Sequence, residues 1–152
     1  MALVFDERVR NLLDGTSFAV LATLMPDGSP QTSVIWIGRA GDVLVFTTHD
    51  LRLKARNLRR DPRASVTLFA LDDPYDTVDI RGTVELVPDP GRALSIELTR
   101  KYTGEDPPPD PPGSSRLIAR LTPARITGWS RGDVGFPVTG WNAGGGGIDT
   151  GS

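Results

Sequence analysis

The sequence predicts a mainly β fold with inserted helices (α+β), in which about six antiparallel strands form a small closed or split barrel. Short runs that alternate apolar and polar residues are joined by tight turns, which is typical of antiparallel hairpins. The order of strand, strand, strand, helix, strand, strand excludes a doubly wound βαβ fold. A glycine at position 82, inside the longest run, indicates the bulge or bend that a barrel corner needs.

The first half of the chain predicts one helix followed by three strands. Residues 5–15 read as a short amphipathic helix, which Asp6 caps and Gly15 ends. The next three apolar runs predict antiparallel strands joined by turns over 25–30 and 38–42, where proline and glycine set the backbone. These strands cover residues 17–24, 31–37 and 43–48.

A basic segment follows, and its apolar residues recur at helical spacing. Leu51, Ala55 and Leu58 lie at i, i+4 and i+7, so we expect a helix over 51–60 with Asp50 as its N-cap. Beyond it the pattern predicts strands, a second helix and a polyproline-like connector. The strands cover 64–71, 77–87 and 116–130, the last interrupted at Pro123; the loop covers 72–76, the helix 88–104 and the connector 105–115.

Length and composition limit the class of protein. The 152 residues suit one domain over 1–130, with a flexible glycine-rich tail over 131–152. The chain has no cysteine and one histidine, which excludes disulfides and multi-histidine metal sites. No apolar run approaches the roughly 20 residues that span a bilayer, so we expect a soluble cytoplasmic protein without a membrane partner. A net charge of −2 argues against nucleic-acid binding.

Positive charge is nevertheless concentrated in residues 51–63, which hold six basic residues and one acidic residue. The first N–H groups of a helix attract phosphate, and Arg52 in the first turn can bind an anion through its planar guanidinium. Lys54 and Asn57 share a helix face, and Thr47 and Thr48 can add hydroxyl contacts. The segment therefore predicts a phosphate site, although the remaining arginines also fit a solvated stripe.

Other candidate residues are less specific. His49 can serve as a proton donor, but a single histidine in such a loop is more often a cap or a surface residue. Trp36, Trp129 and Trp141 can line a flat aromatic ligand, while Trp36 also fits a core or dimer contact. No nucleophile elbow, zinc-protease motif, calcium loop or dinucleotide fingerprint is present. If the protein is an enzyme, a bound cofactor therefore carries its reactive chemistry.

Four stretches resemble the pyridoxamine-phosphate-oxidase-like split-barrel superfamily, and within it the actinobacterial flavin/deazaflavin oxidoreductases. They are LATLMPDGSPQTSVIWI, VLVFTT, RLKARNLRRDPRASVTL and DIRGTVELV, spread over residues 5–130. The resemblance implies a homodimer of six-stranded split β-barrels of the FMN-binding type. It also implies one cofactor in each groove between the subunits, either the deazaflavin coenzyme F-420 or FMN.

The resemblance further implies which residues hold the cofactor. Arg52, Lys54 and Asn57 match the phosphate-binding element, and Thr47 and Thr48 would hold the ribityl and phosphate part. Residues 33–36 would run beside the ring: Ser33, Val34, Ile35 and Trp36. Tyr75 and Trp129 could approach from the partner subunit. No catalytic residue and no metal ligand are predicted.

The end of the chain departs from the family pattern. Pyridoxamine-phosphate oxidases carry further basic residues there, whereas this chain has Arg131 alone after residue 130. This argues against pyridoxamine phosphate as the substrate, and the short arginine-rich helix favours the deazaflavin coenzyme over FMN. We therefore expect an oxidoreductase that moves a hydride between F-420 and an unsaturated or quinone-like small molecule. FMN is the alternative cofactor, and a non-catalytic flavin or haem carrier is a rival of another class.

Overall fold

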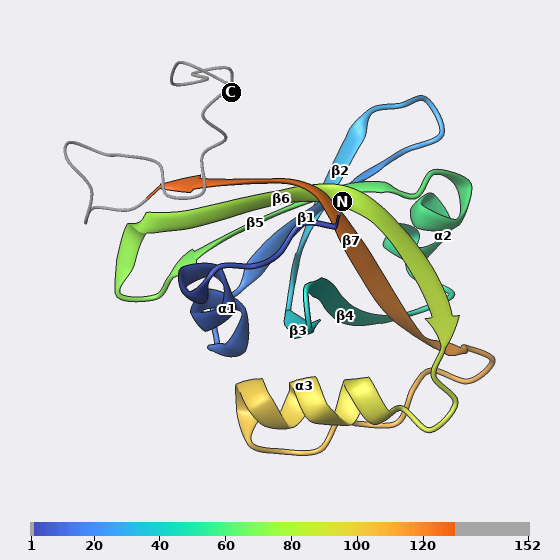
Figure 1. Cartoon of the computed structure of the whole chain (residues 1–152). Coiled ribbons are helices and arrows are strands. Elements are labelled where there is room, and N and C mark those ends of the chain that lie inside the picture. Colours follow the sequence, from blue (N-terminus) through green and yellow to red (C-terminus); the bar gives the residue numbers. More distant parts are fainter. Residues whose placement is uncertain (1, 130–152) are drawn as a thin grey trace.

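The computed structural model describes residues 2–129, which form one curled sheet with three helices (Figure 1). In chain order the elements are α1 (Glu7–Asp14), β1 (Ala19–Leu24), β2 (Pro30–Ile35), β3 (Gly38–Ala40), β4 (Val43–His49), α2 (Leu53–Arg60), β5 (Arg63–Ala70), β6 (Asp73–Pro88), α3 (Ala93–Thr103) and β7 (Arg116–Trp129). The predicted tail over 131–152 lies outside the described residues. None of the helices in the described part of the chain is long and apolar enough to cross a membrane.

The sheet is antiparallel, with the strand order β2-β1-β5-β6-β7-β4-β3. The α+β class is therefore confirmed, but two details of the prediction are wrong. The sheet has seven strands instead of six, and it is not closed, because β2 and β3 are its two edges. The additional strand, β3, lies where a turn was predicted, since three residues are too few to show an alternating pattern.

The two edges of the sheet nevertheless lie near each other. Trp36 and Ile37 alone connect the end of β2 to the start of β3. Since consecutive Cα atoms are about 3.8 Å apart, Ile35 and Gly38 are separated by about 11 Å at most. The seven strands must therefore curl through most of a barrel, which Figure 1 shows as a sheet wrapped around its own interior.

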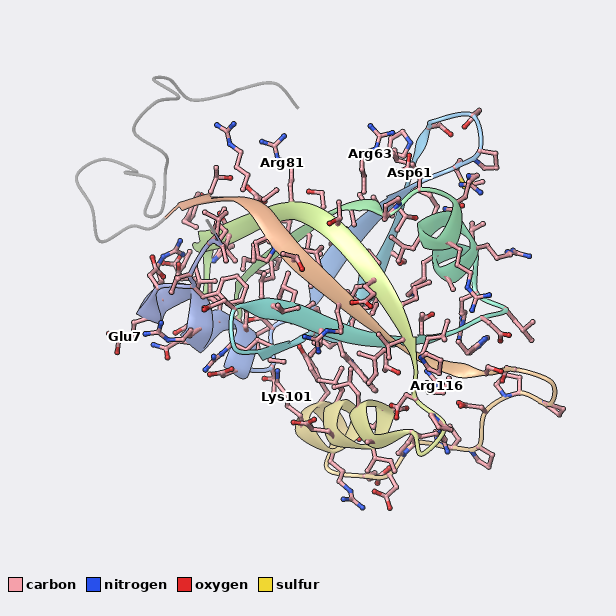
Figure 2. All side chains as sticks on the ribbon, turned by 45° about the vertical axis from the view of Figure 1, so that its right-hand side comes forward. Glu7, Asp61, Arg63, Arg81, Lys101 and Arg116 are labelled. Atoms are coloured by element: carbon pink, nitrogen blue, oxygen red, sulfur yellow. The ribbon has the colours of Figure 1, made fainter. Side chains whose placement is uncertain are left out.

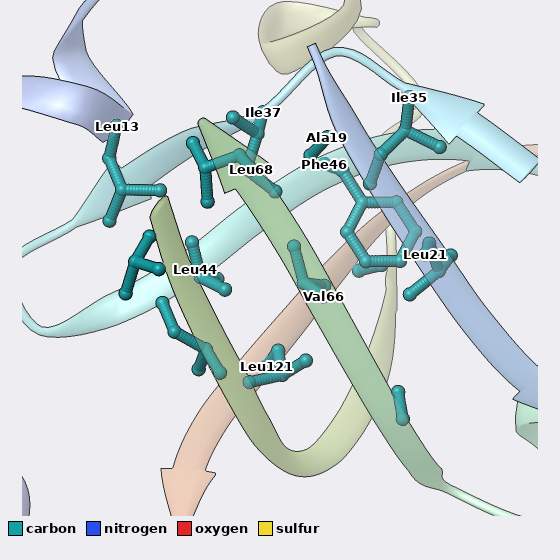
Figure 3. Packing of buried hydrophobic residues seen from close by; sticks show 14 of the residues in the cluster. Leu13, Ala19, Leu21, Ile35, Ile37, Leu44, Phe46, Val66, Leu68 and Leu121 are labelled. Carbon is teal, nitrogen blue, oxygen red and sulfur yellow. The ribbon is translucent and has the colours of Figure 1, made fainter. Parts of the chain in front are cut away.

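The hydrophobic core fills the inside of this curl. One residue in two along β1 and β5 points inward, so that Leu21, Val66 and Leu68 have no exposed surface. They pack with Phe46 and Leu121 from the facing strands (Figure 3). α1 closes one end of the core with its apolar face, and the carboxylate of Asp6 caps it as predicted by accepting the Val9 N–H at 2.8 Å.

β6 and β7 are the longest strands, and they bend together near their middle. The register shifts between Arg81 and Gly82, which confirms the predicted irregularity at this glycine. A Cβ atom at Gly82 would lie 2.0 Å from the Thr122 carbonyl oxygen, so any other residue would force the two strands apart. β7 continues through Pro123, where a break was predicted, and β6 already begins at Asp73, inside the predicted loop.

The basic helix begins later than predicted. α2 has Arg52 as its N-cap, without a side-chain cap bond, and the carboxylate of Asp50 instead accepts the Ser115 N–H at 2.8 Å. Leu51 therefore lies before the helix and is 53% exposed, whereas Ala55 and Leu58 are buried as expected. A bond of 3.0 Å from the Arg52 N–H to the His49 carbonyl forms a turn between β4 and α2.

α3 lies outside the curled sheet, against β4 and β7 (Figure 1). It starts at Ala93, later than predicted, because the Asp89 carboxylate accepts the N–H groups of Ala93 and Leu94 and so caps the helix. Residues 105–115 then return to β7 without helix or strand, as predicted. This return passes the end of β4, where α2 begins.

Candidate functional site

A cavity of about 460 Å³ lies where the ends of β2 and β4 meet the start of α2, and α3 and the proline-rich return complete its wall. Its size is within the range of small-molecule and cofactor sites. Six of the predicted cofactor-binding residues line it, although they come from three separate segments of the chain. They are Val34, Ile35, Trp36, Thr47, Arg52 and Lys54.

Two other predicted residues, Ser33 and Thr48, are not among those that line the cavity. Side chains alternate along a strand, so Thr47 and Thr48 point to opposite sides of β4, and only Thr47 faces the cavity. Thr48 is buried, and its hydroxyl finds no hydrogen-bond partner within the described residues; the same holds for the Ser33 hydroxyl.

The remaining three predicted residues also lie elsewhere. Asn57 is fully buried, and its amide donates to the Thr23 hydroxyl at 3.0 Å and accepts from Arg60 at 2.9 Å. This amide therefore ties α2 to β1. Tyr75 is 47% exposed near the start of β6, and the Trp129 backbone pairs with Thr77 at the far end of β7 from the cavity.

Positive charge in the cavity is not neutralised on the side of α2. Arg52 and Lys54 make no ion pair with an acidic side chain anywhere in the described part of the chain. Burial lowers the pKa of Lys54, and the nearby Arg52 guanidinium lowers it further. A bound anion would relieve this repulsion, and the site is therefore suited to a phosphate.

His49 also lines the cavity; the sequence raised it as a proton donor, favoured a cap or surface residue instead, and did not assign it to the site. It is 6% exposed, and its Nε2 accepts a hydrogen bond of 3.1 Å from the Arg52 Nε. The imidazole is therefore neutral and carries its proton on Nδ1, which is buried and finds no acceptor within residues 2–129. Alternation along β4, which places residues 47 and 49 on one face, was the signal that could have identified it.

The other charged side of the cavity was not predicted from the sequence, and it consists of Arg92, Asp110 and Arg116. Arg116 is the first residue of β7 and lies beside the loop that returns from α3 (Figure 2). It binds the Asp110 carboxylate and approaches the Thr47 hydroxyl at 3.4 Å. Hydrogen bonds from Arg116 lower the pKa of Asp110, and the charges of Arg116 and Arg92 add to the effect. These two arginines are thus already neutralised in part.

An aromatic wall flanks the charged part. The Trp36 ring is stacked on Tyr102 of α3, with centroids 5.3 Å apart and planes 13° apart. The Tyr102 hydroxyl donates to the Ser17 carbonyl at 2.6 Å and accepts the Ile37 N–H at 3.1 Å, which holds both rings in place. β2 is an edge strand, so one side of its backbone has no strand partner within the sheet and is available to a flat ligand.

These features match those of a known family. A family model for pyridoxamine 5'-phosphate oxidase matches residues 5–130, which is most of the chain. The chain belongs to this family. The resemblance inferred from the sequence is therefore confirmed, and with it the assignment to a family of flavin-dependent oxidoreductases.

Solved structures agree with this assignment. The fold is similar to that of an F420 reductase, with 34% identity and a TM-score of 0.71 over 80% of this chain and 98% of that one. A conserved hypothetical protein from Mycobacterium tuberculosis is 25% identical, with a TM-score of 0.66 over 82% and 84% of the two chains. An FMN-binding protein from Nostoc punctiforme shares the fold at 17% identity, with a TM-score of 0.61 over 80% and 78%.

The cavity fits the group that such a family member binds. A flavin-type cofactor needs cationic donors for its phosphate and a flat apolar surface with backbone groups for its ring. Arg52 and Lys54 would supply the cationic donors, and Trp36 with the edge of β2 would supply the flat surface and the backbone groups. The described residues contain no cluster of acidic and histidine side chains that could hold a metal ion.

Proposed function

We propose that the protein is an oxidoreductase that uses the deazaflavin coenzyme F-420, with FMN as the alternative cofactor. The observation that carries this proposal is the juxtaposition, in one cavity, of the unpaired cations Arg52 and Lys54 with Trp36 and the edge of β2. The F420 reductase with 34% identity supports the deazaflavin coenzyme over FMN. The substrate would be an unsaturated or quinone-like small molecule.

Each part of the cavity would have its own task. Arg52 and Lys54 would bind the phosphate, while the Thr47 hydroxyl would hold the adjoining polar chain. Val34, Ile35 and Trp36 would lie beside the ring and fix its orientation. The cofactor supplies hydride transfer when it is bound, so the protein needs no nucleophile of its own. Its residues would position the substrate against the ring and keep water away from it.

We further propose that the active unit is a homodimer. An apolar surface lies on the outer face of β1, β2 and β5, and we refer to it as the outer apolar face. It consists of Phe18, Val20, Val34 and Phe69, which are 42–65% exposed. Val34 belongs both to this face and to the cavity. A second copy on the outer apolar face would therefore cover the open side of the cavity near Val34 and complete a cofactor groove.

Titration of the purified protein with F-420 and with FMN, followed by absorbance and fluorescence, tests the proposal. We expect F-420 to bind with a dissociation constant below about 100 μM, which corresponds to about −5.5 kcal/mol. Tighter binding of FMN would make FMN the cofactor, and the absence of binding to both would exclude this class of function.

Turnover distinguishes an enzyme from a carrier. The protein loaded with reduced F-420 should oxidise the coenzyme when a quinone such as menadione is added. An Arg52→Ala/Lys54→Ala variant, which lacks both free cations, should lose this activity at the same coenzyme concentration. Binding without any change in redox state, across a panel of acceptors, would instead indicate a flavin or haem carrier.

A further inference from the structure

The proline-rich return between α3 and β7, residues 105–115, forms part of the cavity wall and has few backbone hydrogen-bond donors in its middle. We call it the strap. Residues 107–112 read PPPDPP, so Asp110 is the only one of the six with a backbone N–H. Proline also makes the segment stiff. The strap therefore cannot be held by a ladder of backbone hydrogen bonds, and its position depends on side-chain contacts.

Asp110 makes the contacts that hold the middle of the strap. Its carboxylate binds Arg116 through both oxygens, with a distance of 3.1 Å from Arg116 Nε to Oδ2. Arg92 approaches the same Oδ2 with its Nε at 3.3 Å and donates to the Pro108 carbonyl at 2.6 Å. Between 15% and 26% of each of these three charged side chains is exposed. The contacts are thus partly shielded from water, and they hold the middle of the strap against Arg92 and Arg116.

The two ends of the strap are attached differently. Ser115 exchanges hydrogen bonds with Asp50, at 2.8 Å and 3.1 Å, and this anchors the strap where β7 begins. At the other end Asp106 pairs with Arg100, but more than 60% of both side chains is exposed. Such surface pairs contribute little to stability. Without the Asp110 contacts, the stiff middle of the strap would keep only the hydrogen bond from Arg92 to Pro108, while the Ser115 bonds and the covalent link to α3 hold its two ends.

We propose that the strap is a gate for the cavity and that the ion pairs of Asp110 with Arg92 and Arg116 are its latch. Pro107, Pro109 and Pro111 line the same cavity as Arg52 and Lys54. When the latch is closed, the strap forms a wall of the cavity; when it opens, the strap swings out as a stiff unit and a ligand enters or leaves. That this ligand is a flavin-type cofactor rests on the proposed function, but the latch can be tested without any ligand.

The first experiment uses the absence of cysteine from the chain. Pro107 is half-buried against the cavity, so a Pro107→Cys variant carries one thiol whose reaction with a disulfide reagent reports opening of the strap. Adding Asp110→Asn should accelerate the reaction at least fivefold. Adding Asp106→Asn is the matched control, since it breaks an ion pair of the same strap outside the cavity, and should leave the rate unchanged. Asp110→Glu retains the charge and should stay within twofold of the parent.

Equal rates for the Asp110→Asn and Asp106→Asn variants would overturn the latch. Circular dichroism and the unfolding midpoint must show that each variant is folded, and Asp110→Glu provides a second folded comparison. If Asp110→Glu increased the rate of the thiol reaction as much as Asp110→Asn does, this would also contradict the proposal, because the charge of residue 110 would then not matter.

The second experiment measures flavin binding by stopped flow, with FMN and with riboflavin, which lacks the phosphate. A gate predicts that Asp110→Asn raises both the association and the dissociation rate constants, by a similar factor, for both flavins. A change for FMN alone would overturn the gate, since it would show that Asp110 acts through its charge on the phosphate. If neither flavin binds, FMN is excluded as the cofactor. The thiol experiment still decides whether the latch exists.

Discussion

Lys54 and Arg59 lie five residues apart on α2, but the structure gives them different surroundings. Lys54 is half-buried in the cavity beside Arg52, while Arg59 is exposed and outside it. We expect Lys54→Ala to weaken cofactor binding by about 1.5–3 kcal/mol, the usual range for a hydrogen bond to a charged group. Arg59→Ala should leave the affinity unchanged in the same titration. Equal losses would mean that the positive charge of α2 acts as a whole, without a defined phosphate site.

His49 is expected to make stability depend on pH. Burial lowers the pKa of His49 below its ordinary value of 6.5, and the charges of Arg52 and Arg116 lower it further, against a smaller opposing effect of Asp110 and Asp50. As the pH falls below about 6.5, the unfolded histidine takes up a proton that the folded one resists, so the folded state loses stability. A glutamine takes up no proton in this pH range, so the His49→Gln variant should not lose stability in this way.

Urea unfolding at pH 7.5 and pH 5.5 measures the difference. The free energy of unfolding of the wild type should decrease more between these two pH values than that of His49→Gln. Carboxylates that titrate in the same range affect both proteins alike, so the comparison isolates the histidine. A larger decrease in the variant would show that His49 carries a stabilising positive charge in the folded protein.

At the scale of elements, the bend of β6 against β7 requires a glycine. A Cβ atom at Gly82 would meet the Thr122 carbonyl oxygen at 2.0 Å, and this backbone atom cannot move without disrupting the ladder. We expect Gly82→Ala to lower the free energy of unfolding by about 2–4 kcal/mol, as measured by urea titration. Gly91→Ala is the control, because nothing lies within 4 Å of its Cβ position and its φ is not positive. Its stability should change by less than about 0.5 kcal/mol.

The elements that the sequence predicted well are those with a local cause. Asp6 caps α1, alternation defines β1 and β5, and Gly82 marks the bulge between β6 and β7. The start of α2 was misplaced because Leu51 continues the helical spacing although it precedes the helix. β3 was missed because its strand character comes from pairing with β4, which is a tertiary effect.

The candidate site was predictable only in part, because some of its residues are brought together by tertiary packing and not by local sequence. The basic segment and the hydroxyls before it predicted Arg52, Lys54 and Thr47, and the family resemblance implied Val34, Ile35 and Trp36; all six line the cavity. The spacing of helical residues placed Asn57 beside Lys54, but α2 packs on β1 and turns the Asn57 amide toward Thr23. The Asp110 latch could not be predicted, since Arg92 lies before α3 and Arg116 after the strap. Only the folded chain brings them together.

At the scale of the whole molecule, the curl of the sheet assembles the site. The short connection through Trp36 and Ile37 brings the two sheet edges together, and residues of both α2 and α3 line the same cavity. The cavity therefore depends on long-range packing, and its open side borders the outer apolar face at Val34. This position is what makes a second subunit relevant to cofactor binding.

The dimer prediction follows from that arrangement. Val20 pairs with Val34 across β1 and β2, and Phe69 extends the outer apolar face on β5. Replacing Val20 and Phe69 by glutamate would place two carboxylates in an apolar interface, where a charge without a partner is strongly unfavourable. We expect the double variant to weaken dimerisation by about 2 kcal/mol or more, the cost typical of central interface residues. Sedimentation velocity over a range of concentrations measures this directly.

The control for the interface is Arg56→Glu, which changes charge on the exposed surface of α2 and should leave the mass of the assembly unchanged. Cofactor binding then connects the interface to the site. If the partner completes the groove at Val34, the monomeric double variant should bind the cofactor more weakly, although Arg52 and Lys54 are intact in it. A folded monomer with the affinity of the wild type would show that one chain forms the whole site, and the role proposed for the second subunit would be wrong.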